Sequence, residues 1–558
     1  MSANIDVPVL IVGAGPTGLI LALTLAKNGV PVRIVEKDAA FHVGQRGVGV
    51  QPRTLEIYQF LGALPDVKAN GIPVLPFRAY KIGGGDDCVK TFYMSPPTEP
   101  TPAIPNPDSW LLGQNVAQRI LRSHLAKYNC HVELGTTLHS FEQHDDSVVA
   151  KVVRTQADGA EISETIHCHW LVGADGSHST VRKQLGLTFH GEQRAEEAVV
   201  GEIDVQGLDG NFLHNWGDPS TQMLLLRPTE TKDVFAFAFL GSLDYKKILS
   251  DREELVGTLR KFSGRDDLVF GEVKSVGYFQ PHIRMVNKFN VGRVFVAGDA
   301  AHVHSPAGGQ GMNSSMQDVF NLGWKLALVE KGLASRTLLE SYTDERLPVI
   351  AEMLKVTTEL LNRRSARARE GELEGVRTER AYANEEKMKQ LKVNYRWSAI
   401  VQDERKPFEE NAPLDPYGIL GDGVVRAGDR APDAPGLVKV GTGQTLSLFD
   451  IFSPSYHTVL VFAGDDTTQV GSVIAVLKNY VSEVIRSVAI YGVDTAQPGV
   501  EGTDMVLLDK EGHARAGYAV EKGPMTVVVV RPDGVVGAIV LGAGGVQKYF
   551  EKIFSITA

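Results

Sequence analysis

The chain has 558 residues, 43% of them hydrophobic, and its 67 acidic and 57 basic residues give a formal net charge of -10. This length supports two or three domains with buried cores, and the acidic balance excludes nucleic acid or an anionic membrane as the main partner. There is no basic, cleavable leader and no apolar run of the roughly 20 residues that span a bilayer, and the three cysteines lack metal-ligand spacing. We expect a cytoplasmic, metal-free protein that acts on a small molecule.

The first forty residues predict a β-α-β unit. A β-branched run at 9–12 precedes a glycine-rich turn, helical spacing follows over 19–27, and a second strand at 32–35 ends on Glu36. This order of elements is typical of a domain that binds a dinucleotide.

A GxGxxG sequence, formed by Gly13, Gly15 and Gly18, lies between the first strand and the helix. The first glycine allows a tight turn, the second lets a pyrophosphate approach the backbone, and the third lets helix and strand pack closely. The helix N-terminus favours the phosphate charge. Glu36 is expected to hold ribose hydroxyls, and its neighbour Lys37 belongs to the same binding segment. FAD and NAD share this fingerprint, so it does not choose between them.

Later segments predict further strands and helices. Strands at 170–172 and 294–297 each end in a Gly/Asp turn, and the strand runs between 196 and 285 suit an antiparallel sheet that carries a substrate pocket. The other expected strands are 223–226, 234–240, 458–462, 484–491 and 526–530, and the other helical segments are 340–396 and 470–480.

A second flavin signature follows the strand at 294–297. The segment Gly298-Asp299-Ala300-Ala301-His302, with Pro306, Gly308, Gly311, Met312 and Asn313 after it, resembles that of the para-hydroxybenzoate and phenol hydroxylase family. The resemblance implies FAD. Asp299 ends a strand and can accept a hydrogen bond from a ribityl hydroxyl of FAD, and the glycines form a loop thin enough to lie against the flavin ring. The helix that starts near Asn313 would then stabilise an anionic reduced flavin.

The segment 173–179 resembles the central Asp-Gly motif of the same family, which is associated with FAD and with the pyridine nucleotide. Its Asp175 can contact a ligand, cap the helix that starts near Ser179, or do both. Arg46 and Gln114 match family residues near the FAD pyrophosphate, ribityl chain and linker, although an ordinary surface role for Arg46 stays open. Arg53 lies in the same matched segment, but capping of its own helix or pairing within it is favoured over a contact with FAD.

The resemblance covers nearly the whole chain and implies an α/β fold. A Rossmann-type FAD-binding domain carries an inserted antiparallel substrate sheet, a helical segment follows, and a thioredoxin-like α/β domain ends the chain. Because residues after 426 contain no cysteine, this last domain cannot exchange disulfides, and we expect an architectural role, with a homodimer through it. The expected domains are 1–195 with excursions to the substrate region near 71–110, 196–285 for the substrate sheet, 286–410 for completion of the FAD-binding domain, 411–426 as linker and 427–558.

By resemblance the chain is an FAD-dependent monooxygenase that hydroxylates a phenolic or other aromatic substrate with NADPH or NADH and O2, through a C4a-hydroperoxyflavin. No second GxGxxG with a following acid is present, so the nicotinamide is expected to bind only transiently. Trp216, Phe235, Phe237 and Pro306 are the candidate substrate pocket, in which the three rings would form an aromatic wall, although ordinary core packing is the favoured interpretation for any one of these rings.

The group that would deprotonate the phenol is not identifiable from the sequence. Where the family places an acid, an arginine and a tyrosine, this chain has Arg46-Gly47 and Phe235-Ala236-Phe237. The catalytic candidates are His214, His302 and His304, with Pro306 near them, although a lone histidine is usually structural. Epoxidation or oxidation of a polycyclic aromatic by the same fold stays open, whereas the three intact flavin segments argue against a non-enzymatic flavin sensor.

Overall fold

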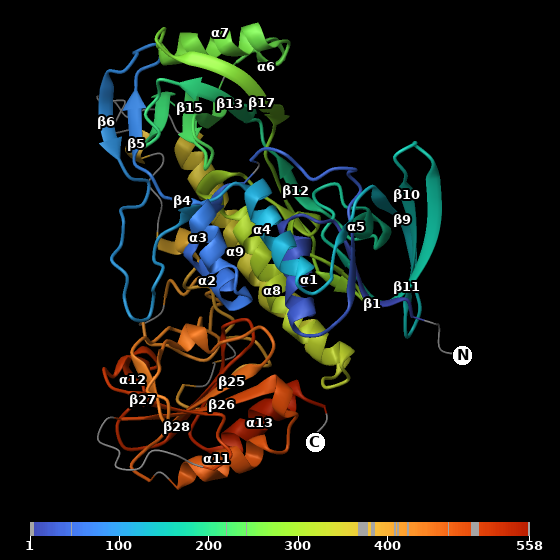
Figure 1. The fold of residues 1–558 in the computed structure, drawn as a ribbon, viewed down its shortest axis with the longest axis vertical. Helices are drawn as coiled ribbons and strands as arrows, with labels where there is room; N and C mark the ends of the chain where they lie inside the picture. The colour runs from blue at the N-terminus through green and yellow to red at the C-terminus, as the bar shows by residue number, and fades with distance from the viewer. Residues whose placement is uncertain are drawn as a thin grey trace.

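The computed structural model describes residues 5–45, 47–218, 220–241, 243–365, 378–380, 386–406, 409, 412–420, 423–466, 468–492 and 501–555. The fold is α/β with several mixed sheets (Figure 1). Within these ranges, no helix combines the length and the apolar character needed to cross a membrane.

The first sheet contains the N-terminal β-α-β unit. Its main path runs β19-β20-β11-β1-β2-β8, with β10 and β9 added beside β11. Its strands are β1 (Val7–Val12), β2 (Val32–Val35), β8 (Val132–Glu133), β9 (Thr136–Gln143), β10 (Val148–Thr155), β11 (Glu161–Gly173), β19 (Asn290–Val291) and β20 (Val294–Val296). Helix α1 (Pro16–Lys27) joins β1 to β2, which confirms the predicted unit. Strand β11 is much longer than predicted, because its first part pairs with β10 outside the parallel sheet.

A seven-stranded sheet lies above the first part in Figure 1 and is covered on its far side by α6 (Tyr245–Ile248) and α7 (Arg252–Ser263). Its order is β17-β13-β16-β15-β14-β5-β6, and its antiparallel centre confirms the prediction for this region. Its strands are β5 (Phe77–Tyr80), β6 (Cys88–Phe92), β13 (Ala198–Gln206), β14 (Leu213–Gly217), β15 (Gln222–Pro228), β16 (Val234–Gly241) and β17 (Val269–Phe279).

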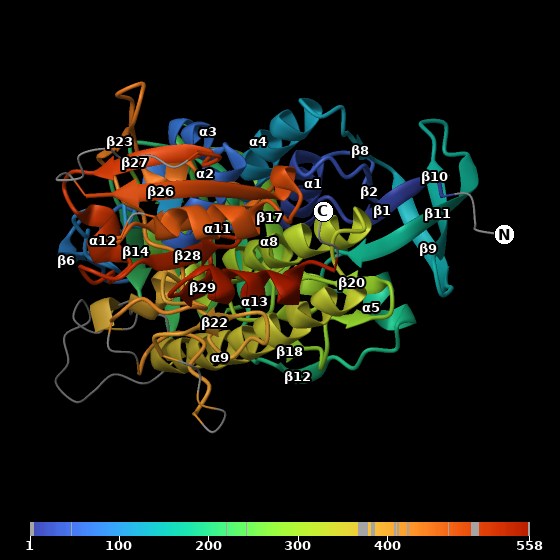
Figure 2. The same cartoon turned by 90° about the horizontal axis from the view of Figure 1, so that it is seen from below.

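Helices fill the space between the sheets (Figures 1 and 2). Helix α1 packs against α8 and α4, and its whole middle is buried. The other helices of this part are α2 (Pro52–Leu61), α3 (Leu64–Asn70), α4 (Gln114–Ala126), α5 (Thr180–Gln184), α8 (Gly311–Glu330) and α9 (Glu340–Ser365). Two small three-stranded sheets complete this part. One has the order β3-β7-β4, with strands β3 (Gly49–Val50), β7 (Trp110–Leu111) and β4 (Ile72–Pro73). The other has the order β12-β18-β21, with strands β12 (His190–Gln193), β18 (His282–Met285) and β21 (His302–Val303).

The described residues from 427 onward, which we call the C-terminal unit, form an eight-stranded sheet together with β22 (Gln402–Asp403). Its other strands are β23 (Leu437–Lys439), β24 (Thr445–Leu446), β25 (His457–Phe462), β26 (Ile485–Tyr491), β27 (Met505–Asp509), β28 (Thr526–Val530) and β29 (Val536–Val540), and its helices are α11 (Gln469–Leu477), α12 (His513–Gly517) and α13 (Ala543–Ile553). The strands predicted at 458–462, 484–491 and 526–530 are confirmed as β25, β26 and β28.

Buried charges join the C-terminal unit to α8 and α9. Glu345 of α9 accepts hydrogen bonds from Lys325 of α8 at 2.8 Å and from Arg531 at 2.7 Å, and all three side chains are fully buried. Arg531 also pairs with Asp533. Against the effect of burial, the charges of Arg531 and Lys325 hold the pKa of Glu345 below its ordinary value. Because a buried charge is tolerated only when it is paired, this cluster fixes how the C-terminal unit docks.

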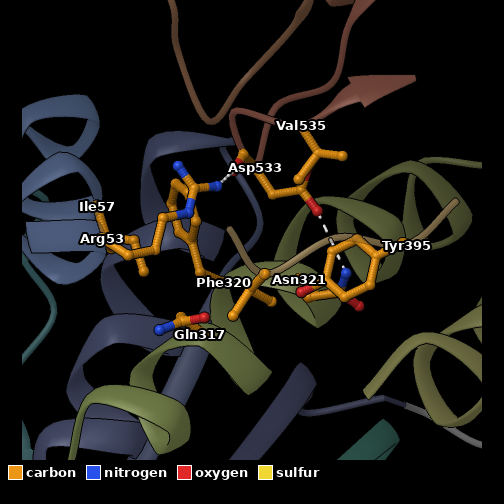
Figure 3. Close-up of a pocket in the computed structure, with 9 residues that line it drawn as sticks. Arg53, Ile57, Gln317, Phe320, Asn321, Tyr395, Asp533 and Val535 are labelled. Carbon is orange, nitrogen blue, oxygen red and sulfur yellow. Dashed lines mark hydrogen bonds between the residues drawn. The ribbon is translucent and has the colours of Figure 1, made fainter. Parts of the chain in front are cut away.

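A small cavity lies at the same junction (Figure 3). Figure 3 shows Arg53 of α2 and Asn321 of α8 near Asp533: Arg53 donates to the Asp533 carbonyl at 2.8 Å and Asn321 to its carboxylate at 3.3 Å. Arg53 also pairs with Glu56 at 2.6 Å, which confirms the predicted pairing within its helix. Side chains from both α2 and α8 therefore donate hydrogen bonds to Asp533 at the junction.

Replacing Arg531 with Met should lower the free energy of unfolding by about 3–5 kcal/mol, because it leaves the carboxylates of Glu345 and Asp533 buried with too few donors. Urea unfolding of the purified protein measures the change. Arg33→Met is the matched control, since Arg33 pairs with Glu133 and Glu164 but is 24% exposed, and should cost about 1 kcal/mol or less. Equal losses in the two variants would contradict the structural role of the cluster.

Candidate cofactor and substrate site

Four strand ends meet at one edge of the first sheet. Val35, Val12, Gly173 and Val296 stand side by side in the parallel register, one from each of β2, β1, β11 and β20. The residues that follow these strands are the ones that the sequence motifs single out. Segments up to about 300 residues apart in the chain are thus brought to the carboxyl edge, where open α/β sheets bind their ligands.

The three glycines of the first motif have distinct surroundings. Gly13 has a φ of 103°, and a Cβ there would lie 2.3 Å from the Ala174 carbonyl oxygen; a Cβ on Gly18 would lie 2.0 Å from the Gly13 carbonyl oxygen. A Cβ on Gly15 would meet nothing within 4 Å. Gly13 and Gly18 are therefore needed by the fold, whereas Gly15 borders open space.

Glu36 lies beside this turn. Its Oε2 accepts a hydrogen bond from the Ala14 amide at 2.9 Å, and its Oε1 accepts one from Asp38 N at 3.2 Å. The carboxylate is half-buried at the end of β2, and Lys37 is exposed next to it. Both residues are at the edge where the motif would place a ribose.

Asp175 caps helix α5. Its Oδ2 accepts from the backbone N–H of Thr180 at 2.7 Å and of Val181 at 3.2 Å, and Ser179 accepts from Arg182 N at 2.9 Å. The Oδ1 atom is buried and has no hydrogen-bond partner among the described residues. The capping role of Asp175 is therefore observed, and one oxygen remains for a ligand.

Asp318 of α8 fixes the turn after β20, in which the exposed Asp299 lies. The Asp318 carboxylate accepts from Gly298 N at 3.2 Å, His302 Nε2 at 2.7 Å and Arg346 Nε at 2.8 Å. Burial alone would raise the pKa of Asp318, but Arg346 and His302 hold it below its ordinary value. His302 is fully buried in this contact, which gives it a structural role in place of the catalytic one considered from the sequence.

The loop from Pro306 to Gly311 enters α8 and is held by Asn313. The fully buried Asn313 side chain donates to the carbonyls of Gly49 and Gly309, each at 2.7 Å, and accepts from Gln51 N at 2.8 Å. Both amide protons are used, so this side chain shapes the loop.

His304 packs against the start of α8. A Cβ on Gly311 would lie 2.1 Å from His304 Nε2, and one on Gly308 would lie 2.8 Å from Met388 Sδ, so the loop leaves no room for side chains at either glycine. His304 Nδ1 hydrogen-bonds to the Ser305 carbonyl at 2.5 Å. Burial and the neighbouring His302 lower the pKa of His304 to about 4, so its ring is neutral at pH 7. Pro306 is exposed at the start of the loop.

Gln114, Met312 and Gly47 converge near this loop. A Cβ on Gly47 would lie 3.5 Å from Met312 Sδ and 3.6 Å from Gln114 Oε1, and Gln114 N donates to the Gly47 carbonyl at 2.9 Å. Arg46 lies outside the described residues.

These residues fit FAD. The N-cap residues of α1 and α8, Gly15 and Gln310, provide no side-chain cap, so the first N–H groups of these helices can receive anionic or carbonyl oxygens. The open space at Gly15 suits a pyrophosphate, Glu36 suits a ribose, and the buried Asp175 oxygen suits a hydroxyl donor. Bound FAD would supply electron transfer and oxygen activation at the α8 end of this site.

The three aromatic rings that were candidates for the substrate pocket lie elsewhere. Trp216, Phe235 and Phe237 are at most 2% exposed and belong to the core that the seven-stranded sheet shares with α7. Figure 1 shows α7 on the side of the sheet away from α1 and α8. The assignment of these rings to the substrate pocket is thus corrected: strand alternation identifies two faces but not which one is covered by a helix.

His214 lies on this outer face as well. Its Nδ1 pairs with Tyr80 Oη at 2.9 Å and its Nε2 with the Asp209 carbonyl at 2.8 Å. Burial lowers the pKa of His214 to about 4. Both ring nitrogens are occupied, so His214 also has a structural role.

The opposite face of the sheet, which we call the inner face, turns toward the flavin-binding segments. Ser275, Glu202, Ala236 and Arg227 stand in one row across β17, β13, β16 and β15, and directly paired residues share a face. Glu202 and Arg227 are buried.

Gln45 connects this row to the flavin-binding loops. Its backbone N–H donates to Glu202 Oε1 at 2.9 Å, its side-chain oxygen accepts from Arg227, and its side-chain nitrogen donates to Glu230. Glu230 also accepts from Gly113 N at 2.8 Å. Sequence reasoning missed this cluster; its one signal was the presence of charged residues at alternating positions of apolar strands.

Comparison with known proteins agrees with this arrangement. The FAD binding domain family matches residues 6–357. A flavin-dependent monooxygenase of Mycobacteroides abscessus is 33% identical over 98% of this chain and 99% of its own. The 6-methylpretetramide 4-monooxygenase of Streptomyces rimosus is 38% identical over 62% of this chain and 60% of its own. The solved structure of the flavin-dependent monooxygenase PieE with FAD and substrate superposes with a TM-score of 0.81 at 23% identity, over 99% of both chains.

The family match covers more than half of the chain, and the mycobacterial relative aligns with almost all of it. The flavin motifs, the sheet edge that gathers them and the relatives agree on a single class of enzyme. The chain belongs to the FAD-binding-domain family of class A flavin-dependent aromatic monooxygenases, which use FAD, NAD(P)H and O2 to hydroxylate aromatic compounds.

Proposed function

We propose that this enzyme hydroxylates a phenolic ring that lies between the inner face of the seven-stranded sheet and the loop from Pro306 to Gly311. The observation that carries the proposal is the meeting of four strand ends at one edge, where Gly47 lies near Met312 at the start of α8 and Gly44 and Gln45 lie against the inner face. FAD would lie along the edge, with its pyrophosphate at Gly15, its ribose at Glu36 and its ring at the start of α8.

The side chains that border this space suit an aromatic ring. Ala236 and Ala238 on the inner face are partly exposed, whereas Phe235 and Phe237 beside them are buried on the outer face. Small side chains leave room for a ligand, and apolar surroundings exclude water from the reacting atoms.

The same observation supports a second candidate, a polycyclic aromatic substrate. Two alanines in succession on one face give a wide, shallow lining, and the relative from Streptomyces rimosus is named for a pretetramide. Epoxidation of an alkene by the same site stays an alternative.

For the C-terminal unit we propose a thioredoxin-like domain with an architectural role. Support comes from its central order β26-β25-β28-β29, with α11 between β25 and β26 and α13 after β29, and from the absence of cysteine after residue 168 in the sequence. The domain limits predicted above, and a homodimer through this unit, remain proposals that analytical ultracentrifugation and limited proteolysis can test.

Substrate class is decided by stopped-flow reduction of the flavin. NADPH and NADH are each mixed with the holoenzyme alone and with simple phenols, polycyclic phenols or alkenes, and loss of flavin absorbance is followed. We expect a phenol to accelerate reduction by about tenfold or more and to yield hydroxylated product. Acceleration by polycyclic compounds alone would favour the second candidate, and alkene-specific acceleration would favour epoxidation. Failure of both reductants with every compound would contradict the enzymatic role.

The proposed pyrophosphate position predicts different effects for two glycine substitutions. Gly15→Val should weaken FAD binding by about a hundredfold or more, equivalent to about 2.7 kcal/mol, while the apoprotein keeps its stability, because the new side chain enters open space. Gly18→Val should instead destabilise the apoprotein, since its Cβ meets the Gly13 carbonyl. FAD titration by fluorescence and thermal unfolding of the apoproteins separate the two. Normal FAD affinity in Gly15→Val would place the pyrophosphate elsewhere.

A further inference from the structure

The cluster around Gln45 contains two carboxylates, Glu202 and Glu230. They differ in how many of their oxygens accept hydrogen bonds. Both oxygens of Glu230 accept hydrogen bonds, one from Gly113 N and one from the Gln45 side chain. Glu202 accepts through Oε1 alone, from Gln45 N. Its Oε2 has no hydrogen-bond donor among the described residues and lies 3.8 Å from the position of a Cβ on Gly44. One carboxylate oxygen of Glu202, on the inner face, is thus not used in a hydrogen bond with the described residues.

The surroundings of Glu202 suit a group that takes up a proton. Burial raises the pKa of its carboxyl; the Gln45 N–H and the Arg227 charge oppose this, and the Glu230 charge adds to it. The charged groups facing it are Arg227 from β15 and Glu230 after that strand, and Ser275 of β17 is its uncharged neighbour. A carboxyl whose pKa lies closer to that of a phenol is a better base toward it.

The histidines considered from the sequence do not compete for this role. His214 is on the outer face with both nitrogens bonded, and His302 is bound to Asp318. His304 bonds to the Ser305 carbonyl and turns its Nε2 toward Gly311. Glu202 is on the face that borders the proposed substrate space.

We propose that Glu202 is the base that deprotonates the phenolic substrate. The phenol O–H bond breaks, its proton passes to Glu202 Oε2, and the electron pair stays on the phenolate oxygen, which makes the ring more electron-rich for hydroxylation. Arg227 offsets the negative charge of the cluster and, through Gln45, positions the loop beside it. This inference rests on the proposed function, because it requires a phenolic substrate on the inner face.

The test compares Glu202→Gln holoenzyme with wild type over a range of pH, using a phenol that wild type hydroxylates. At neutral pH the variant should lose about a hundredfold in kcat/KM, and the loss should disappear as the pH approaches the phenol's own pKa of about 10. With pentachlorophenol, which is already ionised at neutral pH, the variant should match wild type. FAD content and reduction without substrate should not change. Glu197→Gln, one residue before β13 and outside the cluster, is the matched control and should follow wild type.

Parallel pH profiles for Glu202→Gln and wild type, or a loss that persists at high pH and with pentachlorophenol, would overturn the proposal. If the variant fails to hold FAD, the test uses wild type alone and records the ultraviolet difference spectrum of the phenol bound to oxidised holoenzyme. The bound phenol should be phenolate at a pH where free phenol is neutral. A neutral bound phenol would also overturn the proposal. Wild type that hydroxylates no phenol would instead remove the proposed function.

Discussion

The parallel register of β2, β1, β11 and β20 is the constraint on which the site depends. Each strand ends at the same level, so the turn after each one opens at the same edge. A shift of one residue in any pair would turn the side chains of that strand to the other face and displace its motif from the others. The close contact of Gly13 with Ala174 shows how little freedom this edge allows.

Helix α8 extends this constraint through the molecule. Its first turn forms the end of the glycine loop, Asp318 in its middle holds the strand end before Asp299, and Lys325 near its end pairs with Glu345. A single rigid element therefore connects the cofactor edge to the C-terminal unit. In an α-helix these positions keep fixed spacing and direction, so the loop and the domain junction are positioned together.

Local patterns in the sequence predict much of this arrangement. The β-α-β unit, the three predicted strands of the C-terminal unit and the capping by Asp175 depend on neighbours within a few residues, and the structure confirms them. The assignment of Phe235 and Phe237 to the substrate pocket was wrong. The two rings alternate along the strand as expected, but they face α7, an element that the strand pattern does not locate. Asp318, Gln45 and Glu202 were missed because their partners are far away in the sequence and no local motif marks them. The tight turn at the first glycine motif was predicted correctly because it depends on local backbone geometry.

The charged junction around Glu345 has a consequence for how this enzyme can be divided. Trp324 of α8 is 1% exposed and lies against His457, and Arg531 and Asp533 complete the charges around α8 and α9. A fragment that stopped at the linker would expose this tryptophan and leave Glu345 without its arginine. The C-terminal unit therefore contributes to the stability of the flavin-binding half, and we expect the two to unfold together.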